Sequence, residues 1–175
     1  MKRFALVAAL VLFGVIAATP AHSQINSPPP ALMGQPSFHL YSVPGVIASL
    51  SVHTFFGCTN TTSVNIRVGV ETFLGVGGPG SNDPSGTSLD IPPGGSRIFG
   101  TSQAIGISVA SVVGGFQSNS ARILATARSG IICSAFLADP GNSPPTSMTA
   151  LTIVKQNTLW VPENLSGFFR KFCPV

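Results

Sequence analysis

Residues 49–70, SLSVHTFFGCTNTTSVNIRVGV, contain two runs in which apolar and polar side chains alternate. Alternation with a period of two is typical of a β-strand with one buried face, and the polar residues 59–62 between the runs predict a turn. The side chains expected to face the interior are Leu50, Val52, Thr54, Phe56 and Cys58, followed by Val64, Ile66, Val68 and Val70. His53 falls on the opposite face, which we expect to meet solvent.

Similar short runs continue downstream, and they predict strands at residues 89–91, 96–101, 105–109, 121–127, 131–137 and 147–155. The Ser129-Gly130 turn predicts that the runs on either side of it pair as an antiparallel hairpin. No segment shows a helical period, and only 8% of residues are charged. The sequence therefore predicts an all-β fold, a two-sheet antiparallel β-sandwich of about eight strands with Greek-key connections. A closed barrel is the alternative.

The N-terminus has the layout of a secretory signal peptide, which we place at residues 1–23. Lys2 and Arg3 precede an apolar run at residues 4–18, and small residues follow it. Cleavage is expected after Ser23, with Ala21 as the alternative. The fifteen apolar residues are short for a transmembrane helix, so we expect no transmembrane anchor and a secreted or periplasmic protein.

The remaining chain divides into a Pro-rich linker at residues 24–37, a sandwich domain at residues 38–155 and a C-terminal tail at residues 156–175. Removal of Lys2 and Arg3 leaves seven basic and five acidic residues, a net charge near +2. The arginines are scattered singly along the chain, without the clustering that a phosphate backbone requires. Nucleic acid is therefore not an expected partner. In the tail, Trp160, Phe168, Phe169 and Phe172 are interleaved with Arg170 and Lys171, which predicts either packing on the sandwich or docking on a partner or membrane surface.

Two of the three cysteines are expected to form a disulfide. Cys58 and Cys133 both lie on predicted inward faces, and disulfides persist in extracytoplasmic compartments. The alternative is a pair of buried free thiols. Cys173, near the C-terminus, is expected to be a free thiol or to compete for this bridge, with pairing to another chain as the remaining alternative.

The ionisable residues form no recognisable catalytic or metal-binding motif, so we expect no catalytic residues, no metal ligands and no cofactor. No serine lies in a G-x-S-x-G motif followed by an acid and a histidine, and no Cys or His pair has the spacing of a zinc site. The residues that could still converge in a hydrolase site are His39, His53, Asp83, Asp90 and Asp139.

Four stretches resemble a group of small exported bacterial β-sandwich proteins of unassigned function. They are FFGCTNTTSVNIRVGV, LDIPPGGSRIF, ARILATARSGIICSAFLAD and PPTSMTALTIV, within residues 45–155. The group is loosely similar to immunoglobulin-like domains. In those domains a tryptophan packs against the disulfide, whereas Trp160 here comes after both Cys58 and Cys133. The resemblance implies a fold and a compartment and carries no activity over.

These observations predict a non-enzymatic module of the cell envelope or exterior. Its expected partner is an envelope or extracellular protein or a glycan, bound through loops such as Gly75–Gly86. A periplasmic or extracellular hydrolase is one alternative. A self-assembling surface subunit is another, and it predicts an open edge strand. The sequence leaves the oligomeric state open.

Overall fold

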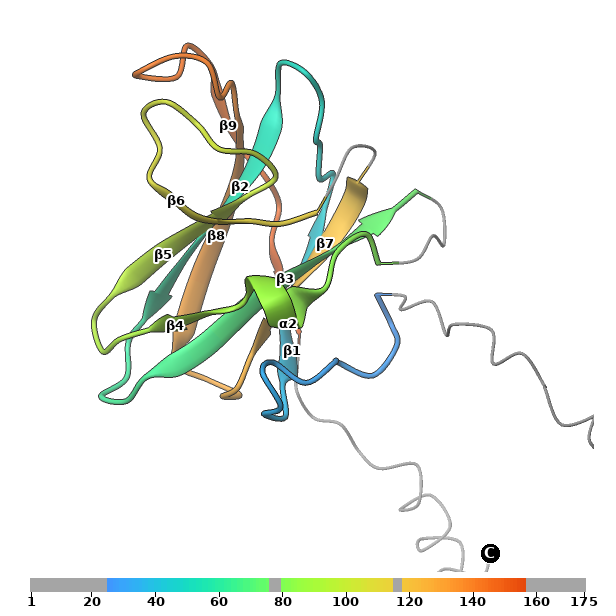
Figure 1. Cartoon of the computed structure of the whole chain (residues 1–175), viewed down its shortest axis with the longest axis vertical. Coiled ribbons are helices and arrows are strands. Elements are labelled where there is room, and N and C mark those ends of the chain that lie inside the picture. Colours follow the sequence, from blue (N-terminus) through green and yellow to red (C-terminus); the bar gives the residue numbers. More distant parts are fainter. Residues whose placement is uncertain (1–24, 76–79, 115–117, 157–175) are drawn as a thin grey trace, which may run out of the picture.

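In the part of the chain that the structure describes, ten strands form two five-stranded sheets that pack face to face as a sandwich (Figure 1). The computed structural model describes residues 25–75, 80–114 and 118–156. The first sheet has the order β10 (Val154–Lys155), β1 (Phe38–Pro44), β7 (Ser118–Ala125), β3 (Ile66–Leu74) and β4 (Leu89–Ile91). The second sheet has the order β6 (Val109–Val112), β5 (Ser96–Gly100), β2 (His53–Asn60), β8 (Ile131–Ala138) and β9 (Met148–Ala150). One short helical turn, α2 (Pro84–Thr87), lies between β3 and β4.

The predicted all-β sandwich is confirmed, with all pairs antiparallel except β5 with β6. Two differences raise the number of strands above eight. β1 was not predicted, and the predicted strand at residues 147–155 divides into β9 and β10, which join different sheets.

The core between the sheets contains side chains that alternation assigned to the interior of the central strands, namely Phe56, Cys58, Ile66, Val68, Val70, Ala121, Ile123 and Ala125. It also contains side chains that alternation did not assign, among them Tyr41 and Val43 of β1 and Phe99 of β5. The alternation fails at the starts of the runs. Leu50 is 93% exposed and Val64 is 62% exposed, because β2 begins only at His53 and β3 only at Ile66. Ile105 is likewise exposed, in the loop before β6.

The predicted hairpin across Ser129-Gly130 is wrong. β7 pairs with β1 and β3 in the first sheet, whereas β8 pairs with β2 and β9 in the second. The connection at residues 126–130 therefore crosses from one sheet to the other. Gly130 has a positive φ of 83°, and its carbonyl accepts a hydrogen bond from the Thr61 N–H at 2.8 Å. A turn with a glycine at positive φ can therefore connect strands of two different sheets as well as two paired strands of a hairpin.

Candidate functional site

The N-terminal segment at residues 25–37, which we call the strap, lies against the outer face of the first sheet (Figure 1). It reverses direction at Met33 and Gly34, which both have positive φ values, and Leu32 and Gln35 exchange two backbone hydrogen bonds across this turn. The turn places Leu32 against the sheet with no solvent exposure. The segment expected from its composition to be a Pro-rich linker thus covers a sheet face.

Gly69 of β3 makes room for Leu32. A Cβ atom at position 69 would lie 2.9 Å from Leu32 Cδ2 and 2.9 Å from the Pro84 carbonyl oxygen, which is closer than real Cβ contacts allow. Ser85 of α2 also holds the strap, because its hydroxyl oxygen accepts a hydrogen bond from the Met33 N–H at 2.8 Å. The strap and α2 therefore contact each other and both pack over Gly69 of β3.

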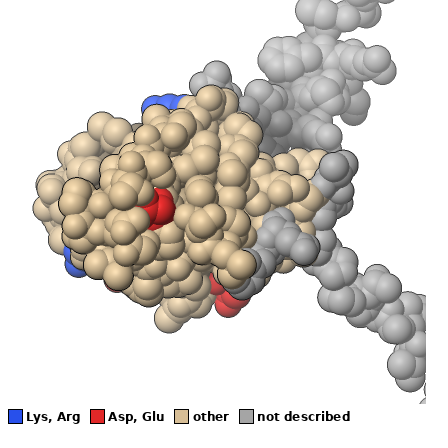
Figure 2. All heavy atoms as spheres, turned by 90° about the horizontal axis from the view of Figure 1, so that it is seen from above, with Lys and Arg blue, Asp and Glu red and all other residues tan. Residues whose placement is uncertain are grey.

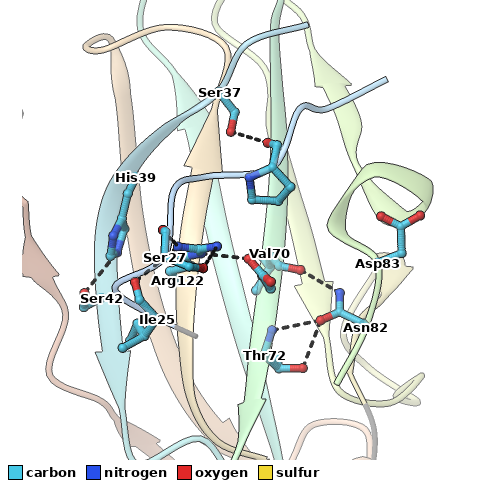
Figure 3. Close-up of polar contacts among 12 residues, drawn as sticks. Ile25, Ser27, Ser37, His39, Ser42, Val70, Thr72, Asn82, Asp83 and Arg122 are labelled. Carbon is cyan, nitrogen blue, oxygen red and sulfur yellow. Dashed lines mark hydrogen bonds and ion pairs between the residues drawn. The ribbon is translucent and has the colours of Figure 1, made fainter. Parts of the chain in front are cut away.

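A buried ion pair lies beneath the strap (Figure 3). Glu71 of β3 and Arg122 of β7 are directly opposite in the strand register, and Arg122 Nε donates to Glu71 Oε2 at 2.7 Å. Their side chains are 2% and 0% exposed. The Phe73 ring lies 5.3 Å from the guanidinium carbon, within the range of a cation–π contact.

The strap supplies further acceptors for Arg122 (Figure 3). Arg122 Nη1 donates to the carbonyl oxygens of Ile25 at 3.2 Å and Ser27 at 2.6 Å, and Nη2 donates to the Ser27 hydroxyl at 3.4 Å. A buried guanidinium needs such acceptors because each unsatisfied donor costs free energy. The ion pair and the strap therefore stabilise each other.

Sequence reasoning missed this pair because it assigned Glu71 to a solvent-facing side and treated Arg122 as an isolated charge. The usable signal was weak. Two opposite charges on the polar faces of strands, in a chain with five acidic residues, are candidates for pairing across neighbouring strands.

His39 lies on β1 beside this pair. Its Nε2 lies 3.1 Å from the Tyr41 carbonyl oxygen and 3.0 Å from the Ser42 hydroxyl. Burial lowers the pKa of His39, and the nearby positive charge of Arg122 lowers it further, while the contact with the Tyr41 carbonyl acts in the opposite direction. Burial and the guanidinium therefore both favour the neutral form of the imidazole.

The other histidine of the described residues, His53, corrects a prediction. It begins β2 in the second sheet and is 7% exposed, so it does not face solvent. Its Nδ1 lies 3.2 Å from the Thr101 hydroxyl. Burial lowers the pKa of His53, and hydrogen bonds with Thr101 and Ser49 partly offset this effect.

Both lowered histidine pKa values predict a loss of stability on acidification. The unfolded chain takes up protons as the pH falls through about 6.5, whereas the folded chain resists protonation. The contribution of the two histidines to the free energy of unfolding is therefore complete above that pH, and it decreases as the pH falls toward their folded-state pKa values. In urea titrations between pH 7.5 and 5, we expect the free energy of unfolding to fall less steeply in the H39Q/H53Q variant than in the wild type. Identical slopes would contradict the prediction.

The predicted loop Gly75–Gly86 is anchored along its second part. Asn82 Oδ1 accepts from the Thr72 N–H at 2.8 Å, and its Nδ2 donates to the Val70 carbonyl at 2.8 Å (Figure 3). Residues 76–79 lie outside the described part of the chain. The second part of this loop is thus held against β3 by hydrogen bonds.

The five residues considered for a hydrolase site each have a separate local partner. Asp83 accepts from the Ser85 N–H at the start of α2, and Asp90 forms a partly exposed ion pair with Arg67 at 2.6 Å. Asp139 accepts from the Thr146 hydroxyl and from the Thr146 N–H, and the hydroxyl contact is the main cause that lowers the pKa of its carboxyl. No hydrogen bond or ion pair in the described ranges joins two of the five. The same ranges contain no group of three or more His, Cys, Asp or Glu side chains arranged to hold a metal ion.

Cys58 and Cys133 form a disulfide. They are opposite each other on β2 and β8, with their Cα atoms 4.2 Å apart. The bridge therefore lies within one sheet, whereas the characteristic immunoglobulin bridge joins the two sheets. Cys173 lies outside the described residues, as do residues 1–23 of the predicted signal peptide and all of the tail except Gln156.

Three loops meet at one end of the sandwich, which we call the loop end. They span residues 45–52, 101–108 and 139–147 and lie at the top of Figure 1, beside the start of β2. The Thr101 hydroxyl donates to the Ile47 carbonyl at 3.2 Å, and the Ile105 N–H donates to the Pro140 carbonyl at 2.9 Å. Asp139 is the only charged residue in the three loops. Figure 2, viewed from this end, shows a surface almost free of charged side chains.

No helix among the described residues has both the length and the apolar character needed to cross a membrane. Comparison with known proteins found no matching family model, no matching curated protein and no matching solved structure.

Proposed function

We propose that this chain is an exported, non-enzymatic β-sandwich module that binds an envelope or extracellular protein or a glycan through its loop end. The loop end carries the proposal because it combines exposed apolar side chains with a fixed arrangement. Leu50 and Ile105 are 93% and 64% exposed, and hydrogen bonds link the loops to one another. Exposed apolar groups on linked loops suit recognition, since little ordering entropy is lost when a partner binds.

The compartment and the absence of catalysis are supported separately. A disulfide between Cys58 and Cys133 loosely favours an oxidising, extracytoplasmic compartment. The local partners of the five hydrolase candidates favour structural roles for them, because a nucleophile, a base and an orienting group must converge for catalysis.

Charged substitutions at the loop end test the proposal. We expect Leu50→Asp and Ile105→Asp to reduce binding of the purified mature chain to isolated cell envelopes of its own species at least tenfold, because an aspartate cannot be desolvated in an apolar contact. Binding is measured by cosedimentation over a range of protein concentrations. Val64→Asp is the matched control, since Val64 is 62% exposed in the loop at the opposite end of β2. Equal binding by all three variants and the wild type would refute the loop end as the binding surface.

A further inference from the structure

We propose that the sheet face beneath the strap also binds the strap of a second copy of this chain, so that two copies exchange straps. The structure shows the occupant of this face directly, because the chain's own residues 25–37 already fill it. The same contacts can form between two copies without any new interface.

The face has specific contacts for the strap. Arg122, with no solvent exposure, directs donors at two main-chain carbonyl groups, those of Ile25 and Ser27. Gly69 leaves space for one apolar side chain, that of Leu32. The strap of the same chain and the strap of a second copy can make these contacts with Arg122 and Gly69 equally well.

The strap can leave the face without breaking a sheet. Within the described residues, its only β-bridge is the internal one between Leu32 and Gln35, and it pairs with no strand of either sheet. Its last residues, Pro36 and Ser37, lead directly into β1, and the Ser37 hydroxyl donates to the Pro30 carbonyl at 2.6 Å. Release of the strap therefore breaks its side-chain and main-chain contacts with the face but leaves the strand pairing of both sheets intact.

The sheet edges are a poorer route to self-association. The four edge strands β4, β6, β9 and β10 contain only three, four, three and two residues. Short edge strands offer few unpaired backbone groups to another chain. In dilute solution the tethered strap has an effective concentration in the millimolar range, so the closed monomer dominates and exchange needs a high local concentration.

Two complementary variants of the mature chain, residues 24–175, test the exchange. Leu32→Asp damages the strap and leaves the face intact, whereas Gly69→Val blocks the face and leaves the strap intact. Each variant alone is expected to remain monomeric in multi-angle light scattering at about 100 μM, below the millimolar effective concentration of a tethered segment, because every copy lacks either an intact strap or an open face. An equimolar mixture is expected to form a one-to-one complex with twice the monomer mass. Circular dichroism checks that each variant is folded, and Leu32→Ala and Gly69→Ala replace variants that are not.

A synthetic peptide of residues 24–37 provides a second readout that does not depend on the Gly69 variant. The folded Leu32→Asp chain is expected to bind this peptide at least tenfold more tightly than a peptide carrying the same substitution, as measured by fluorescence anisotropy. Equal binding of the two peptides would overturn the site. Peptide binding without a complex in the mixture of folded variants would overturn the second copy as the occupant.

Discussion

Replacing Arg122 by alanine is expected to lower the free energy of unfolding by about 3–5 kcal/mol, because the Glu71 carboxylate stays buried without its partner. The Ile25 and Ser27 carbonyl groups of the strap lose their donor at the same time. The measurement is urea unfolding of the mature chain followed by circular dichroism.

Arg67→Ala is the matched control, since Arg67 also pairs with a carboxylate across two strands of the first sheet. Its pair with Asp90 is partly exposed, so the expected cost is about 0–1 kcal/mol. The double variant Arg122→Met/Glu71→Met is expected to be more stable than Arg122→Ala, because it removes both buried charges. A cost below about 1 kcal/mol for Arg122→Ala would contradict a buried, strap-covered pair.

Removing the disulfide is expected to have an effect of similar size. The bridge closes a loop with a sequence separation of 75 residues. Loop entropy gives about 4–5 kcal/mol for such a loop, and native disulfides typically contribute about 2–5 kcal/mol. Cys58→Ala/Cys133→Ala should therefore lower the unfolding midpoint in guanidinium chloride strongly.

Cys173→Ser is the control for this experiment, and we expect it to leave the midpoint unchanged. Addition of dithiothreitol to the Cys173→Ser chain should reproduce the loss seen in the double alanine variant. An unchanged midpoint under reducing conditions would contradict a stabilising bridge between Cys58 and Cys133.

The inner layer could be predicted from the sequence because one physical pattern determines it. Val68 and Val70 on β3, and Ala121 and Ile123 on β7, are buried as their alternation indicates. Alternation specifies which side chains share a face of the strand. A shift of one residue would turn the apolar side chains toward solvent, so burial of that face fixes the register.

The outer layer could not be predicted in the same way. Glu71 and Arg122 occupy polar positions, and alternation does not distinguish a polar residue in solvent from one covered by another segment. The covering segment, residues 25–37, has no period of its own, and its prolines favour a linker interpretation. Sheet membership was equally hidden, because Ser129-Gly130 has the composition of a hairpin turn although its flanking strands belong to different sheets.

The strand order also has a consequence for folding kinetics. β1 is flanked by β7 and β10, so residues 38–44 find both neighbours only in the C-terminal half of the chain. Closing such long loops before any pairing is gained slows folding in proteins dominated by distant contacts. A chain that emerges N-terminus first must therefore keep its earliest strand unpaired until most of the sequence has followed.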